Sequence, residues 1–560
     1  MRASVPILGV PAAVALTALA FSQTTTRLST FNGGGQIGDF SRAPAISGTG
    51  RFVAFMCPDD ALAGALSNGD IYVHDRDPDG DGVFDQGNGV IEMVSVSSAG
   101  VHGNTSSDYP AISSDGRYVA FLSAATNLVV PDTNGFPDIF VRDRQLGLTE
   151  RITGVGGVPQ PNNFSRGIVI SGDGRYVAFE TTATNQFAGD SNGASDVFRF
   201  DRQTLALQLV SINSAGTGVA NAASNDPQLS GDGRYVAFES GATNLVAGVG
   251  ADQVYVRDML TGTTSAVSRS STGALGNQLS FESSISADGR FVAFASYATN
   301  FSPLDPGFSK DVYLRDLTLG TTELISVNSL GVKANGSSSS EPVVSADGSY
   351  VAFWSSANNL WWNGTSLTDV YIRDRARGQT RQASFSSGGN AGNGNSANFS
   401  GLALAGDGMS VVFASDATNL VPGDTNNRLD VFARELCDDT GFELGYGLVG
   451  SNGLMPTLEV CGELATGSQA TFTLHHAPPN TLSVIFRSAV LNPVAFHGGT
   501  RAVGQPWMRT TILTDATGSA SFTIPGGGGP SDLYVQWLMR DGGLPGLTGF
   551  SNALRVPVLP

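Results

Sequence analysis

The sequence predicts an all-β protein: a seven-bladed β-propeller closed by an N-terminal strand, followed by a small β-sandwich domain. Three observations support this prediction. The pattern Ser-x-Asp-Gly-Arg-Tyr-Val-Ala-Phe recurs, with variations, seven times at intervals of 56 to 66 residues. Each interval holds four short strand-like segments. Glycine accounts for 71 of 560 residues while only 14% are charged, a composition typical of a protein made of strands and turns.

The elements of one repeat are clearest in its second copy. Residues 110–113 and 117–123 are expected to be strands, with Asp115-Gly116 as the tight turn between them, because glycine takes a positive φ without steric cost. After a polar loop come a third strand at 138–143 and a fourth at 149–153. Apolar residues on both faces of the second strand indicate a sheet covered by neighbouring blades. The seven copies begin at residues 47, 113, 171, 230, 286, 345 and 405.

The fourth strands indicate how the ring closes. Six repeats are followed by their own fourth strand, at residues 91–96, 149–153, 207–212, 263–268, 321–327 and 379–384. The seventh repeat ends at 430–435 with no such strand after it, whereas residues 25–29 have the character of a fourth strand. We therefore expect the N-terminal strand to complete blade seven, which also protects sheet edges from aggregation.

Three regions are expected along the chain: a signal peptide (1–22), the propeller (23–437) and the β-sandwich-like domain (438–560). Arg2 precedes an apolar stretch at 5–21 that ends in small residues, as in a secretory signal. A retained N-terminal anchor is the alternative. No later segment approaches the roughly 20 apolar residues of a membrane span. The protein is therefore expected in the periplasm or outside the cell.

The C-terminal region contains seven strand-like runs separated by Gly- and Pro-rich turns, a pattern that favours a β-sandwich. Cys437 and Cys461 flank its start and could pair in an oxidising compartment. Cys57 aligns with serines of other repeats and is expected to be a small buried side chain. Nothing in this region identifies a ligand.

The repeat, followed by Asp-Val-Tyr-Val-Arg-Asp, resembles the WD40-like (PD40) repeat of TolB-type propellers over residues 24–436. The resemblance implies a periplasmic or extracellular scaffold, often one that binds proteins. That family usually has Pro-Asp-Gly at the turn, where this chain has Ser, Gly or Ala before Asp-Gly. Related propellers also precede peptidase domains. That reading is excluded because the C-terminal region is too short, is expected to be β and has no Gly-x-Ser-x-Gly. The one copy of this motif, at 189–193, lies in a loop rather than in the strand–turn–helix context of a hydrolase nucleophile.

The strongest site pattern is an Asp- and Gly-rich insertion at residues 77–85. Asp77, Asp79, Asp81 and Asp85 take positions 1, 3, 5 and 9 of a calcium loop, and Gly82 takes position 6. Alternating carboxylates can converge on one hard cation. Position 12 is Asn88 rather than the bidentate Glu of an EF-hand. The alternatives are a Ca²⁺ site and a solvated hairpin tip.

Two further patterns are weaker. The spacing Asp-x-Asn-Gly-x-x-Asp at Asp132–Asp138 and Asp190–Asp196, with a variant at Asp424–Asp430, could bind cations, although side chains that cap their own loop explain it at least as well. Trp354, Trp361 and Trp362 could contact a ligand or partner, or pack locally. The five histidines show no metal-ligand spacing, and we identify no catalytic or cofactor-binding residue.

The predicted function is a secreted, non-catalytic scaffold that binds a protein partner or a cell-surface glycan, with calcium as a possible stabiliser. The net charge of −18 disfavours nucleic acid and anionic membranes as partners. The alternative is a polysaccharide lyase or glycosidase whose acidic residues gather at the channel from several blades. The sequence does not place a carboxylate pair in one pocket, nor does it specify the oligomeric state.

Overall fold

The structure is a computed structural model. It describes residues 24–436 except residues 33, 59–68, 191, 249–251, 338–340, 362–366, 388–389 and 398–400, and beyond residue 436 it describes only the backbone of ten strands. The expected signal peptide, the Cys437 and Cys461 side chains and Trp362 lie outside the described residues. The described part of the chain contains no helix, so none that is long and apolar enough to cross a membrane.

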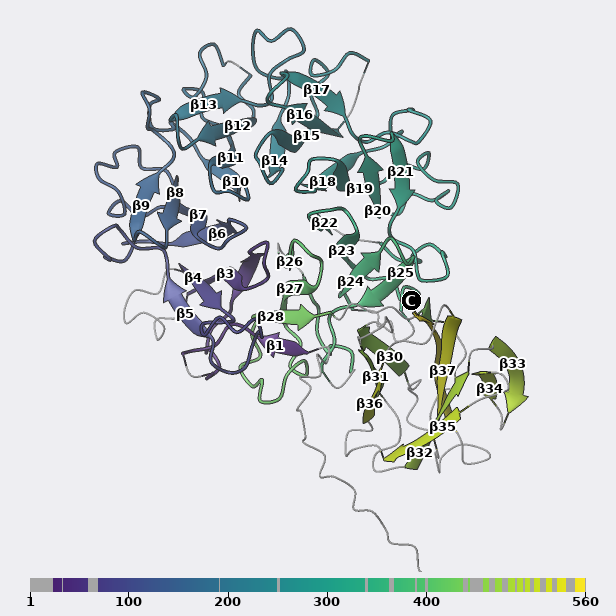
Figure 1. Cartoon of the computed structure of the whole chain (residues 1–560). Helices are drawn as coiled ribbons and strands as arrows, with labels where there is room; N and C mark the ends of the chain where they lie inside the picture. Colours follow the sequence, from purple (N-terminus) through teal and green to yellow (C-terminus); the bar gives the residue numbers. More distant parts are fainter. Residues whose placement is uncertain are drawn as a thin grey trace, which may run out of the picture.

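Seven four-stranded antiparallel sheets form a closed ring, which confirms the predicted seven-bladed propeller (Figure 1). Blades one to three comprise β2 (Arg42–Ile46), β3 (Phe52–Cys57), β4 (Asp70–Asp75) and β5 (Val90–Met93); β6 (Ser107–Ile112), β7 (Tyr118–Ser123), β8 (Asp138–Asp143) and β9 (Leu148–Arg151); and β10 (Ser165–Ile170), β11 (Tyr176–Thr181), β12 (Asp196–Asp201) and β13 (Ala206–Leu209). Blades four and five comprise β14 (Ser224–Leu229), β15 (Tyr235–Ser240), β16 (Gln253–Asp258) and β17 (Thr263–Ala266); and β18 (Ser280–Ile285), β19 (Phe291–Ser296), β20 (Asp311–Asp316) and β21 (Thr321–Leu324). Blades six and seven comprise β22 (Val343–Val344), β23 (Tyr350–Ser355), β24 (Asp369–Asp374) and β25 (Gln379–Gln382); and β26 (Leu402–Leu404), β27 (Ser410–Ser415), β28 (Asp430–Glu435) and β1 (Thr25–Arg27).

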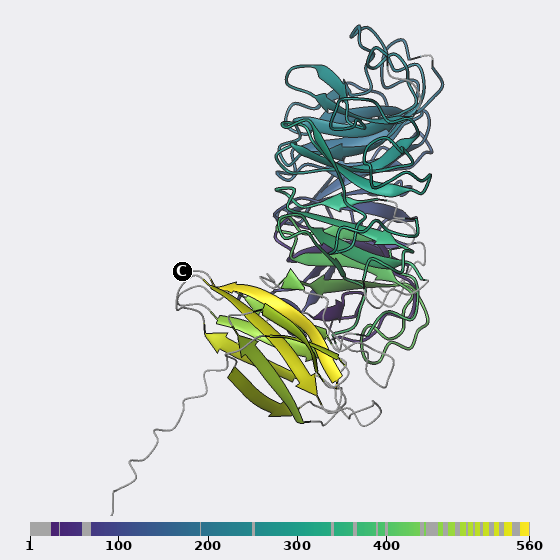
Figure 2. The ribbon, with the colours of Figure 1, turned by 90° about the vertical axis from the view of Figure 1, so that its right-hand side faces the viewer.

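The second and third strands of each blade form the core. In β7, Val119, Ala120 and Phe121 are fully buried although their side chains alternate between faces. Each blade therefore packs against a neighbour on both sides, as the continuous apolar run predicts. Seen from the side, the blades form one thick disc (Figure 2).

The N-terminal strand closes the ring as predicted. β1 pairs antiparallel with β28, with Thr25 opposite Arg434 and Arg27 opposite Phe432. Just beyond β1, the Ser29 hydroxyl donates to Asp430 at 2.7 Å. In blade two the Thr153 hydroxyl makes the same bond to Asp138. The predicted fourth strands extend too far, because the residues after them turn inward to make this bond instead of continuing the ladder.

The Asp-Gly turns of successive blades are joined by backbone hydrogen bonds. The residue before each Asp-Gly donates its N–H to the equivalent carbonyl of the next blade, at 2.8–3.0 Å; the donor–acceptor steps run Ser114 to Gly172, Gly231, Ala287, Ala346, Gly406 and Gly48. Proline has no N–H to donate. The chain's departure from Pro-Asp-Gly at this position therefore has a structural reason: six of these residues hold the ring together.

Beyond the propeller, the backbone forms three sheets in the strand orders β29-β38-β37-β32-β35, β30-β31-β36 and β33-β34. The strands are β29 (Phe442–Glu443), β30 (Thr457–Gly462), β31 (Gln469–His475), β32 (Leu482–Ser488), β33 (Leu491–Phe496), β34 (Gly499–Val503), β35 (Met508–Leu513), β36 (Ala520–Pro525), β37 (Ser531–Met539) and β38 (Gly549–Val558). The sequence did not predict β29, β33 and β34. The packing of these sheets as a sandwich stays a prediction.

Candidate functional site

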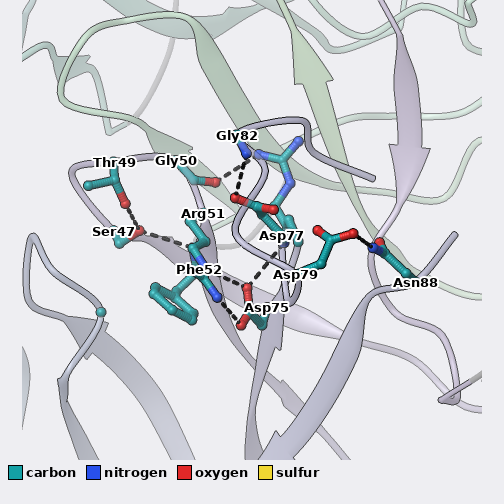
Figure 3. A network of polar contacts seen from close by, with 12 residues as sticks. Ser47, Thr49, Gly50, Arg51, Phe52, Asp75, Asp77, Asp79, Gly82 and Asn88 are labelled. Atoms are coloured by element: carbon teal, nitrogen blue, oxygen red, sulfur yellow. Dashed lines mark hydrogen bonds and ion pairs between the residues drawn. The ribbon is translucent and has the colours of Figure 1, made fainter. Parts of the chain in front are cut away.

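The predicted calcium loop connects β4 to β5 and is folded around Asp77. The two carboxylate oxygens of Asp77 accept the backbone N–H groups of Asp81 and Gly82, at 3.0 and 3.1 Å. Asp79 accepts the Asn88 side-chain amide at 3.1 Å (Figure 3). The loop is therefore held in shape by the same side chains that the sequence singles out.

Three of the four predicted ligands come together. Asp77, Asp79 and Asp81 each offer a carboxylate oxygen, and these oxygens lie within 4.8 Å of one another. Asp77 is buried, while Asp79 and Asp81 are exposed. Asp85 is not part of this group, because its carboxylate pairs with Arg76. The arrangement offers oxygen ligands from three carboxylates to a hard cation such as Ca²⁺.

Arg76 ties this loop to blade seven. Its fully buried guanidinium contacts Asp85 and Glu435, and donates to the Gly50 carbonyl at 2.8 Å. It also lies over the Phe84 ring at 4.7 Å. Burial opposes the charge, but Glu435 and Asp85 outweigh it and raise the Arg76 pKa. Sequence reasoning missed this residue, because its partner on β28 is 359 residues away in the chain.

The predicted aromatic contacts lie against the protein's own core. Trp354, on β23, is half-buried and packs against the core shared by blades six and seven, and the Lys310 ammonium lies 5.5 Å from its ring. Trp361 is half-buried against the core between blades five and six. Neither ring stands free in solvent.

A second candidate site lies in the central channel, where the first strands of all seven blades enclose a cavity of about 400 Å³. Six of these strands hold one residue in the left-handed region, with φ between 50° and 62°, at the same place in the blade: Ala43, Tyr109, Gly167, Asp226, Glu282 and Glu341. Five of the strands show a register shift against their neighbour at this point. Bulges re-aim side chains and are frequent beside functional sites.

Carboxylates from four consecutive blades gather around this bulge. Glu180 of blade three accepts the backbone N–H of Asp226 in blade four at 2.7 Å. Glu239 of blade four accepts that of Glu282 in blade five at 3.2 Å. Glu341 of blade six lines the same channel as Asp226. The bulges at Asp226 and Glu282 are thus each fixed by an acid on the preceding blade.

The cluster has more acids than bases. Its enclosed position raises the pKa of Asp226 well above the ordinary value, and the charges of Glu239, Glu341, Glu180 and Glu282 raise it further. Glu180 pairs with Arg166, and Glu282 lies 3.5 Å from the Lys310 ammonium. Asp226 therefore keeps its proton to a higher pH than an ordinary carboxyl group.

The sequence analysis did not find this cluster, because no local motif marks it. One signal was present: five residues at the same place in successive first strands differ from blade to blade (Ala43, Tyr109, Gly167, Asp226, Glu282), while the serine two residues before them and the Ile or Leu three residues after them are kept. Variation at one fixed position of a repeat is expected where loops or bulges face a ligand.

Comparison with known proteins finds similar solved structures but no matching family. No family model matches the chain, and no curated protein matches it. Among solved structures, TolB from Agrobacterium tumefaciens is 14% identical over 62% of this chain and 94% of its own, with a TM-score of 0.33. The periplasmic gluconolactonase of Pseudomonas aeruginosa is 16% identical over 61% and 84%, at 0.31. The GH74 xyloglucanase of Xanthomonas campestris is 9% identical over 92% and 80%, at 0.38. At these values the likenesses carry no argument about activity.

Proposed function

We propose that this chain is a secreted, non-catalytic propeller that binds a protein partner through the acidic cluster at its channel (Glu180, Asp226, Glu239, Glu282 and Glu341). One observation carries the proposal: carboxylates from blades three to six converge where the backbone bulges toward the channel. A rigid acidic cavity suits the lysine or arginine side chains of a partner, because complementary charge steers encounter and selects partners. The signal-like residues 1–22 support export.

The test is capture of partners from cell-envelope and culture fractions by the propeller and by a charge-neutralised variant. Asp226→Asn with Glu341→Gln removes two acids of this cluster, and we expect about tenfold weaker binding of any specific partner. Glu92→Gln with Glu150→Gln is the matched control, because these acids are partly exposed on the fourth strands β5 and β9, away from the channel cavity, and pair with Arg144 and Arg202. Equal loss in both variants would reduce the effect to net charge and contradict the proposal.

The loop of blade one is proposed to bind Ca²⁺ through Asp77, Asp79 and Asp81. The support is the proximity of their carboxylate oxygens, within 4.8 Å. Bound calcium would stabilise the folded state. We expect calcium to raise the melting temperature of wild-type protein more than that of Asp79→Asn. An equal response of both proteins would speak against this loop as the site.

The alternative function is a glycan-acting enzyme at the same channel. It is favoured by one observation: Asp226, a carboxyl group with a raised pKa, lies among other carboxyl groups from neighbouring blades. Glycoside hydrolysis needs a protonated acid beside an ionised carboxylate. Release of reducing sugar from a polysaccharide panel, lost in Asp226→Asn, would favour the enzyme over the binding scaffold.

A further inference from the structure

Four blades share a pair of aspartates at the start of the third strand. One comes from the loop before the strand and the other from the strand's first residue; the pairs are Asp132 and Asp138, Asp190 and Asp196, Asp305 and Asp311, and Asp424 and Asp430. The second aspartate of every pair is 0% exposed. A buried carboxylate needs a partner that compensates its charge or its hydrogen bonds.

Blade five supplies that partner from its own chain. The Lys333 ammonium lies 2.8 Å from Asp311 Oδ2 and 3.3 Å from Asp305 Oδ1, and it donates to the Ser309 hydroxyl at 2.7 Å. A single positively charged nitrogen therefore sits between the two carboxylates. This blade shows that the pair can hold a cation.

Blades seven and two use other donors. In blade seven the Gln36 amide nitrogen lies 2.8 Å from Asp424 and 3.3 Å from Asp430, and Arg27 lies 3.8 Å from Asp424. In blade two Arg151 lies 3.7 Å from Asp138. Each of these pairs has a basic side chain within ion-pair distance.

Blade three carries both acids but apolar residues at the donor positions. An isolated β-bridge joins Val219 to Ile212 in blade three. The equivalent β-bridges are Lys333 to Val327 in blade five and Gln36 to Thr30 in blade seven. Val219 therefore stands where those two blades place the nitrogen that contacts both aspartates. On the fourth strand of blade three, Leu209 lies opposite Phe198. The same position holds Arg151, opposite Phe140, in blade two and Arg27, opposite Phe432, in blade seven. In the described part of blade three, no basic side chain forms an ion pair with Asp190 or Asp196.

Neutral donors contact the buried member of this pair. Asp196 accepts the Ser211 hydroxyl at 2.8 Å and the Asn192 amide at 3.0 Å, and these are its hydrogen-bond partners among the described residues. Burial, with a smaller contribution from the Asp190 charge, raises the Asp196 pKa to about 6. In the same loop, Ser195 Oγ and Gln186 Oε1 are buried oxygens without a hydrogen-bond partner. Both side chains are at least nine-tenths buried.

We propose that the Asp190–Asp196 pair of blade three binds a hard divalent cation, Ca²⁺, in the place that the Lys333 ammonium takes in blade five. Two carboxylates supply the charge, and the loop supplies further oxygen ligands. A divalent ion would neutralise both acids, whereas one ammonium leaves the blade-five pair with a single negative charge. The fold therefore uses one repeated acid pair with different cations in different blades.

The test uses full-length protein carrying Asp79→Asn and Asp81→Asn, so that the loop of blade one does not contribute, at about pH 8, where Asp196 is ionised. Millimolar CaCl₂ is expected to raise the melting temperature by about 1–3 °C over chelator, and NaCl of equal ionic strength is not. Adding Asp190→Asn is expected to abolish the rise. Asp132→Asn is the matched control and is expected to retain it, because that pair already has a basic side chain, Arg151, within ion-pair distance of Asp138.

The converse variant is Val219→Lys, which copies blade five. It is expected to raise the melting temperature in chelator and to remove the response to calcium. If it does not fold, calorimetric titration with CaCl₂ decides instead: Asp190→Asn should bind one ion fewer than its parent. No calcium response in the parent, or an equal response or stoichiometry with Asp190→Asn, would overturn the proposal and leave Asp196 as a protonated, structural acid.

Discussion

At the scale of single residues, the pH dependence of stability follows from Asp226, whose pKa is raised well above its ordinary value. A carboxyl of this kind stabilises the native state fully below its unfolded pKa, about 3.9, and the contribution is lost as pH rises through the folded pKa. Asp226→Asn cannot ionise. We expect it to melt at increasingly higher temperature than wild type as pH rises above about 4. A difference that does not change with pH would contradict the raised pKa.

Arg76 gives a prediction about the free energy of a buried ion pair. Its removal leaves Asp85, whose side chain is 5% exposed, and Glu435 without their shared cation. Breaking a buried ion pair from one side costs about 3–5 kcal/mol, so Arg76→Met should lower the free energy of unfolding by that order. Arg51→Met is the control, since the Arg51–Asp75 pair is partly exposed and should cost about 1 kcal/mol or less. Denaturant unfolding measures both, and similar costs would contradict the role given to Arg76.

The sequence alone predicted the acids of the blade-one loop as a site, but it did not predict the acids that meet at the channel. Asp77, Asp79 and Asp81 are close in sequence, so their spacing predicts that they meet. Glu180, Asp226 and Glu341 meet only because successive blades present the same bulge to one channel. The ion-pair network of Arg76 was also beyond sequence reasoning, because one of its partners, Glu435 on β28, lies 359 residues away in the chain.

At the scale of the element, the Asp-Gly turn explains an invariant glycine. Gly116 has φ of 74°, and a Cβ there would lie 2.1 Å from the Phe52 ring of the neighbouring blade. Gly135 has φ of 71° with no atom within 4 Å of a Cβ. Gly135→Ala should cost about 1–2 kcal/mol from the backbone alone, and Gly116→Ala about 1–3 kcal/mol more from overpacking. Equal costs would mean that contact between blades does not select the glycine.

The residue before the Asp-Gly turn gives a second prediction for this element. Ala287 donates its N–H to the Ala346 carbonyl at 3.0 Å. Ala287→Pro removes the donor and leaves that carbonyl unpaired, at a cost of about 1–3 kcal/mol, which a stiffer unfolded chain offsets by about 0.4–1 kcal/mol. Ala287→Gly retains the N–H and is the control. Greater stability of the proline variant in denaturant unfolding would remove the reason proposed for the absence of proline here.

At the scale of the whole molecule, regularity made the ring predictable. The repeated pattern sets strand order, blade number and closure, since each depends on residues that recur at the same place. What distinguishes one blade from another depends on single exchanges, such as Val219 for Lys333 or Leu209 for Arg151. These exchanges become meaningful only once the strands are aligned in space, which is why the sequence left the acid pairs as an ambiguous pattern.

The closure of the ring gives the last prediction. Among the strands that the structure describes in the propeller, only β1 reaches its blade from the other end of the chain, and the segment after it brings Ser29 to the buried Asp430. Deleting residues 24–30 would expose the edge of β28 and leave that carboxylate without its hydroxyl donor. A chain beginning at residue 31 should therefore melt at a much lower temperature than one beginning at residue 24, and should aggregate on heating. An unchanged melting temperature would mean that the hydrogen bonds between turns and the packing between blades suffice to hold the ring closed.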